Sequence, residues 1–131
     1  MAYGGTITIA YDGGGTTKSD TITKSASGRI SWEEDVATAT TDGQINCPTV
    51  DVSELELLYI KSTQDVTLET NAADASGGNT LNLKANEPYV WWSGAPFVNM
   101  ITADIVTNVF VTNASGATAT ITFEAILDAT P

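Results

Sequence analysis

Apolar and polar residues alternate along most of this chain, and a period of two is typical of β-strands rather than helices. The clearest example is the segment 117–127, where every second residue from Ala119 to Leu127 is apolar and positions 118, 120, 122 and 124 are Thr or Glu. One face of such a strand packs on a core while the other faces solvent. This segment therefore predicts a half-buried strand near the end of the chain.

A hairpin is predicted at the start of the chain. Alternation over residues 6–11 places Ile7, Ile9 and Tyr11 on one face of a strand. An Asp-Gly-Gly-Gly turn signal follows. The Thr- and Ser-rich segment 16–27 then predicts an exposed second strand, paired with the first.

Further short strands are predicted at intervals of about ten residues, with turn signals between them. They are expected near residues 30–32, 55–60, 66–70, 80–83, 89–92 and 105–112. Segment 55–60 is apolar on both sides, as in a strand covered on both faces. The least predictable region is 33–43, because its Thr and Gly residues disfavour a helix and its strand pattern is weak.

These elements amount to about eight to nine short strands, which predicts an all-β fold. We expect a single domain over residues 1–131, built as an antiparallel β-sandwich of jelly-roll or immunoglobulin-like plan. A chain of this length can bury enough surface for one core.

Large side chains concentrate in segment 87–97, which holds two of the three tryptophans and two of the four prolines. Adjacent residues of a strand point to opposite faces, so Trp91 and Trp92 cannot both lie in one core. Tyr89 shares its face with Trp91. The Trp on the other face has three open interpretations. It is covered by a loop of the same chain, it anchors a protein interface, or it stacks on a sugar.

We predict that this aromatic segment and the polar hairpin carry a protein-interaction surface, because Trp and Tyr are favoured anchors of interfaces. The candidate interface residues are Tyr89, Trp91, Trp92, Phe97, Trp32 and Ile22.

The charge balance is strongly acidic, with 16 acidic and 5 basic residues and a net charge of −11. A nucleic-acid binder neutralises phosphates with Lys and Arg. The five basic residues are scattered along the chain without a basic patch. We therefore expect neither nucleic acid nor an anionic membrane as a partner.

The chain has few residues suited to catalysis, and we expect no enzyme, no cofactor and no metal ligands. The chain has no histidine, and a nucleophile at Cys47, its only cysteine, would lack the usual base. Cys47 is expected to be a buried apolar residue. One alternative stays open: turn carboxylates can bind calcium through hard oxygen ligands. The candidates are Asp12, Asp42, Asp74 and Asp104, which do not match the EF-hand spacing.

Four runs of alternating residues and turns in the later part of the chain carry a family likeness. They are Asp51–Ile60, Asp65–Asn71, Leu81–Ala85 with Pro88–Trp92, and Val109–Asn113. In these runs the chain resembles the small all-β virion proteins of tailed bacteriophages. The resemblance extends from Val50 onward, and it is a pattern of alternation rather than a catalytic motif.

The resemblance implies a capsid decoration or cement protein that binds the major capsid protein and stabilises the head lattice. It also implies a homo-oligomer, with a trimer favoured. A tail or neck accessory protein and a carbohydrate-binding module stay open as alternatives. We expect the chain to be made in a host cytoplasm and to reside in the virion. Residues 1–45 lie outside the likeness and are predicted as an extended hairpin or arm that reaches a neighbouring subunit.

Overall fold

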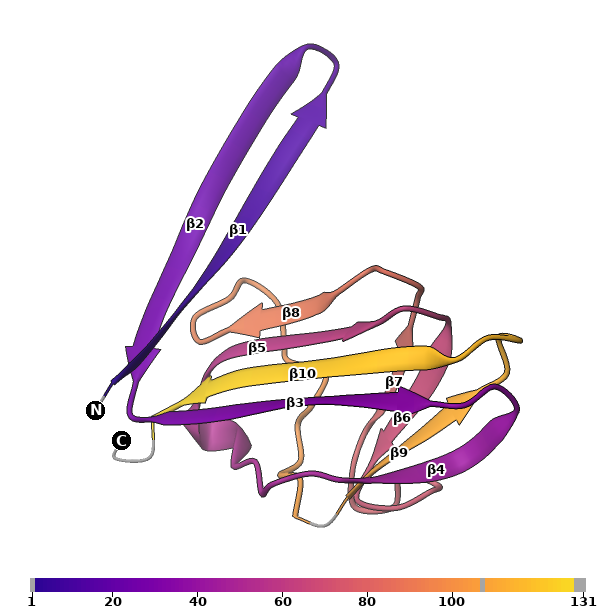
Figure 1. Cartoon of the computed structure of the whole chain (residues 1–131). Helices are drawn as coiled ribbons and strands as arrows, with labels where there is room; N and C mark the ends of the chain where they lie inside the picture. Colours follow the sequence, from indigo (N-terminus) through magenta and orange to yellow (C-terminus); the bar gives the residue numbers. More distant parts are fainter. Residues whose placement is uncertain (1, 107, 129–131) are drawn as a thin grey trace.

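The computed structural model describes residues 2–106 and 108–128. In this part of the chain it has ten β-strands and one short 3-10 turn (Figure 1). They are β1 (Tyr3–Gly13), β2 (Thr16–Ala26), β3 (Gly28–Val36), β4 (Thr40–Asn46), η1 (Val52–Glu54), β5 (Leu55–Ser62), β6 (Val66–Thr70), β7 (Thr80–Leu83), β8 (Tyr89–Trp92), β9 (Asn108–Asn113) and β10 (Ala119–Leu127). The strands pair antiparallel, and the predicted all-β sandwich is confirmed.

Two four-stranded sheets form the body of the protein. The first sheet has the order β3-β10-β5-β8, and the second has the order β4-β9-β6-β7. The inward-facing residues of both sheets form one core. Leu58, Ile60 and Phe123 of the first sheet and Leu68 and Val111 of the second are at most 1% exposed. Alternation along each strand therefore supplies this core, as the period of two predicts.

The chain crosses between the two sheets several times, and the fully buried Asn113 joins two of these crossings, the β3–β4 and β9–β10 connections. Its amide nitrogen donates to the carbonyl oxygens of Val36, Ala37 and Ala117 at 3.0, 3.3 and 2.8 Å. Its amide oxygen accepts from the backbone N–H and the hydroxyl of Ser115. A buried amide satisfied in this way fixes both crossings.

The structure shows a strand, β4, in the region where the sequence pattern is weakest. β4 is an edge strand that pairs with β9, and its register shifts between Thr40 and Gly43. Asp42 lies within this shift at a φ of 52°. Because Ile45 is the one buried residue of β4, the strand has little apolar alternation to detect. The strand expected from residue 105 begins at Asn108, since Ile105 instead bridges to Val50; Thr107 lies outside the described residues.

The β1–β2 hairpin is a two-stranded sheet of its own, and we call residues 3–26 the arm. Its pairing runs without interruption from Tyr3 opposite Ala26 to Gly13 opposite Thr16. Figure 1 shows the arm rising away from one end of the sandwich. The segment 1–45, expected as an arm, thus divides in two: β1 and β2 project, whereas β3 and β4 lie in the two sheets of the body.

Candidate interaction surface

The base of the arm rests on the outer face of the first sheet. Ala26 of β2 forms a second buried cluster with Leu57 of β5 and Ile126 of β10. Gly5 of β1 lies so close that a Cβ at its position would stand 2.6 Å from Leu57 Cδ1 and 3.3 Å from Ile126 Cγ1. Glycine therefore allows the arm to approach the sheet closely.

Three residues of the arm, Tyr3, Ile7 and Ile22, are half-buried against this second cluster. The half-buried Trp92 of β8 packs against it from the body. Apolar packing therefore attaches the arm to β5, β8 and β10, and it leaves the outer half of the arm beyond this support.

Two different faces run along the arm because its side chains alternate. One face is rich in hydroxyl groups, and its cross-strand Thr pairs Thr6–Thr23 and Thr8–Thr21 have hydroxyl oxygens 3.5 Å apart. The other is the apolar face, which continues outward from the second cluster. It includes Ile9, 44% exposed, and Tyr11, 61% exposed. These two exposed side chains make the outer part of the apolar face a candidate interaction surface.

Charged residues stand directly across the hairpin from these exposed side chains. Asp20 is opposite Ile9, and Lys18 is opposite Tyr11. Two of the five basic and two of the sixteen acidic residues lie in the arm, so the arm is neutral and the rest of the chain carries the whole net charge of −11. The arm can thus approach an acidic surface without net repulsion.

The two adjacent tryptophans of β8 point to opposite faces of the first sheet, as strand geometry predicts. Trp91 packs against the main core, and Trp92 packs against the second cluster. Trp91 donates from its indole Nε1 to the carbonyl oxygen of Phe97 at 3.2 Å. Phe97 also meets Trp92 edge-to-face, with ring centroids 5.3 Å apart. A loop of the same chain therefore contacts both indoles, and both are half-buried.

Tyr89 fixes the loop that follows β8. Its hydroxyl donates to Asn99 Oδ1 at 2.6 Å and accepts from the backbone N–H of Met100 at 2.8 Å. Burial raises the pKa of Tyr89, and the hydrogen bond from Met100 lowers it in part. Ile101, 1% exposed, anchors the same loop in the main core. These hydrogen bonds and the buried Ile101 anchor the loop to the body.

This anchored loop presents three exposed apolar side chains, which we call the loop patch. They are Phe97, 44% exposed, Val98, 82% exposed, and Met100, 53% exposed. Residues 88–103 around them carry no charge, and Glu87 and Asp104 flank the segment. An exposed apolar patch with acidic flanks on an ordered loop is typical of an interaction site.

Trp32 lies away from the other candidates, on β3 at the opposite edge of the first sheet from β8. Its indole stacks on Phe123, with ring centroids 5.2 Å apart and planes 6° apart, and its Nε1 donates to Cys47 Sγ at 3.2 Å. Burial raises the pKa of the Cys47 thiol, and the hydrogen bond from Trp32 lowers it in part. Trp32 thus contributes to the packing of the core.

Five of the six candidate residues lie on β8, on the loop that follows it and on the arm base, and they are divided between the two faces of the first sheet. Those five are Tyr89, Trp91, Trp92, Phe97 and Ile22. The sequence candidates do not include Ile9, Tyr11, Val98 or Met100, which are exposed. Alternation shows the shared face of Ile9 and Tyr11, but only the fold shows that the outer part of this face is uncovered.

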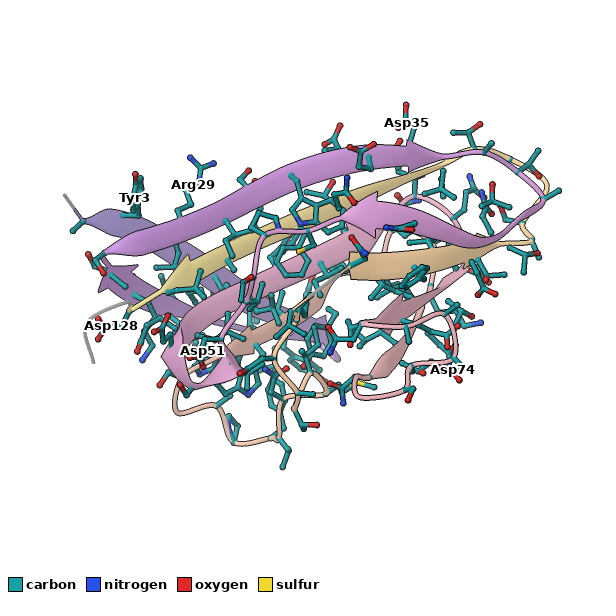
Figure 2. The ribbon with its side chains drawn as sticks, turned by 90° about the horizontal axis from the view of Figure 1, so that it is seen from below. Tyr3, Arg29, Asp35, Asp51, Asp74 and Asp128 are labelled. Atoms are coloured by element: carbon teal, nitrogen blue, oxygen red, sulfur yellow. The ribbon has the colours of Figure 1, made fainter. Side chains whose placement is uncertain are left out.

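The four turn aspartates are not gathered into one site. In the described residues no three acidic or cysteine side chains converge as metal ligands. Asp74 accepts from the Ser76 N–H, and Asp104 accepts from the Val52 N–H. Figure 2 shows Asp74, one of these four, apart from the labelled carboxylates of Asp35 and Asp51. Within residues 2–106 and 108–128, no helix is long and apolar enough to cross a bilayer.

Comparisons with protein-family models, curated protein sequences and solved structures gave no match.

Proposed function

We propose that the chain is a non-enzymatic structural protein of a tailed-phage virion, which binds the capsid and bridges neighbouring subunits of the head. The observation that carries this proposal is the arm, a two-stranded extension with exposed apolar residues on its outer half. An isolated hairpin is only marginally stable in water. A long arm of this kind is useful to a protein that has a neighbour to reach.

The body supports the same role. Its core is closed by side chains of both sheets, and the buried side-chain polar atoms of the described residues have hydrogen-bond partners. A rigid body with an arm and a separate loop patch suits repeated contacts on a lattice, where many weak interfaces add up. A place in the tail or neck would use the same surfaces.

The carbohydrate-binding alternative has less support. A sugar ring stacks on an exposed aromatic face, and the three tryptophans are half-buried. Trp32 and Trp92 pack on other rings, and Trp91 packs against the core.

Co-sedimentation of the purified chain with empty heads and tails from a panel of tailed phages tests the proposal. We expect saturable binding to one kind of head and a higher disruption temperature of the decorated head. Binding to tails alone would instead indicate a protein of the tail or neck. The proposal fails in favour of carbohydrate binding if the chain stays in the supernatant with every particle but binds a glycan array, with quenching of its Trp fluorescence.

A further inference from the structure

We infer that the outer half of the arm docks on the loop patch of a second copy of this chain, in a head-to-tail contact. The inference rests on the proposed structural role and names the partner of the arm. Ile9 and Tyr11 provide one side of the contact, and Val98 and Met100 provide the other.

The arm of a given copy carries its exposed residues away from its own loop patch. Trp92 links the arm base to Phe97 within one chain, because it packs against the second cluster and meets the Phe97 ring. Tyr11 lies six residues beyond Gly5, which is about 20 Å along an extended strand. Figure 1 shows the hairpin rising away from β8 and the loop that follows it. The two apolar surfaces of one chain are therefore available to different neighbours.

The two surfaces are similar in chemistry, and neither carries a strong net charge. Each exposes large apolar side chains, and residues 88–103 carry no charge. Lys18 lies across the hairpin from Tyr11 and Asp20 lies across from Ile9, so the charges beside the two apolar side chains of the arm balance. A contact made by the neutral arm also keeps two strongly acidic bodies further apart than direct packing of those bodies would. This arrangement lowers the electrostatic cost of association.

The loop patch is also prepared for binding before a partner arrives. Hydrogen bonds from Trp91 Nε1 to the Phe97 carbonyl oxygen, and between the Tyr89 hydroxyl and Met100, hold the loop in place. The backbone N–H of Ser93 donates to the Glu56 carbonyl oxygen at 2.9 Å. Pre-organisation of this kind reduces the entropy lost on association.

A head-to-tail contact uses two different surfaces, so each copy can make two contacts and copies can close into a ring. Four side chains provide this contact, and contacts of small area are weak or transient one at a time. We therefore expect concentration-dependent self-association that becomes strong when several contacts act together.

Sedimentation velocity on purified full chains, without phage particles, tests this inference. The arm variant is Ile9→Thr with Tyr11→Ser, and the loop variant is Val98→Ser with Met100→Ser. The wild-type chain should associate as concentration rises, and each variant alone should be monomeric. An equimolar mixture of the two variants should form a 1:1 heterodimer and nothing larger. The intact arm of the loop variant can dock on the intact loop of the arm variant, and no further contact remains.

Two matched controls should behave as the wild-type chain does. Ala10→Ser changes the opposite face of the same strand, between Ile9 and Tyr11, and Val106→Ser removes an exposed apolar side chain outside the loop patch. Circular dichroism melts of all variants should show the same body transition, since the substituted side chains are exposed.

Three results would overturn the inference. They are a wild-type chain that stays monomeric at about 1 mM, a loop variant that still self-associates, and variants that do not combine in the mixture. The second result would point to arm-to-arm pairing. Because no particles are present, failure here leaves binding to phage heads to be judged by its own assay.

Discussion

Trp91 and Trp92 are adjacent in β8, yet they belong to two separate hydrophobic clusters on opposite sides of one sheet. Trp91 helps to close the core of the sandwich, and Trp92 packs against the cluster that supports the arm. The two indoles share Phe97, which accepts a hydrogen bond from one and packs edge-to-face on the other. Strand β8 therefore connects the stability of the body to the attachment of the arm.

Truncating each tryptophan should separate these two roles. Trp91→Ala should lower the free energy of unfolding of the body by about 3 kcal/mol, at the low end for Trp in cores because the indole is half-buried. Trp92→Ala should have a smaller effect on the body and should speed amide exchange at the arm base. Guanidinium denaturation and hydrogen exchange measure the two effects. Equal losses of body stability would argue against two separate clusters.

The approach of the arm to the body depends on Gly5. In Gly5→Val the new side chain would collide with Leu57 and Ile126, so the arm base must shift outward. We expect faster exchange of amides 3–8 and 21–26 and a changed Trp92 fluorescence. Gly4→Val is the matched control, because nothing lies within 4 Å of a Cβ at Gly4. If both variants leave the arm unchanged, the arm base does not need this close packing.

Much of this fold could be predicted from alternation. How clearly each strand could be predicted depended on its position in the sheet. β10 is central in the first sheet, and its core-facing residues recur at every second position from Ala119 to Leu127, so its pattern is clear. β4 is an edge strand with a register shift, so its apolar signal is weak. The sequence also shows that Trp91 and Trp92 diverge. It cannot show which of them faces the core, since that depends on the strands that pair with β8.

The exposed surfaces were harder to predict for a related reason. Ile7 and Ile9 look alike in the alternating pattern of β1, but Ile7 packs on the second cluster and Ile9 extends beyond it. This difference depends on the length of the arm and the position of the sheet beneath it. Val98 and Met100 lie in an irregular loop, where no periodic pattern distinguishes an exposed side chain from a buried one.

Replacing Asn113 should destabilise the crossings between the sheets. Asn113→Ala removes a buried amide that is hydrogen-bonded to three carbonyl oxygens and to Ser115. A buried polar group left without a hydrogen-bond partner costs about 1–3 kcal/mol. We expect a loss of several kcal/mol in the free energy of unfolding, measured in guanidinium. Asn46→Ala, on an exposed residue of β4, is the control and should change stability little. Similar values for both variants would mean that the Asn113 network contributes little.

Stability should fall in the alkaline range. Burial raises the pKa of Cys47 above its ordinary 9.0 and that of Tyr89 above 10.0. The folded state therefore keeps these protons where the unfolded state loses them. The stabilisation is complete below the ordinary pKa values and is lost as pH rises through the folded ones. Cys47→Ala should make the fall that starts near pH 9 shallower, and Tyr89→Phe should do the same for the part near pH 10. An identical pH profile for all three chains would contradict this assignment.

The central claim is that the arm is the part of this chain that engages a partner, and hydrogen exchange of residues 8–20 tests it most directly. We predict rapid exchange in the dilute monomer, because a hairpin without further support opens readily. In the concentrated or head-bound protein the same amides should become protected, while the amides of β5 and β10 exchange as before. If residues 8–20 exchange equally fast in both states, the arm is not the interaction element.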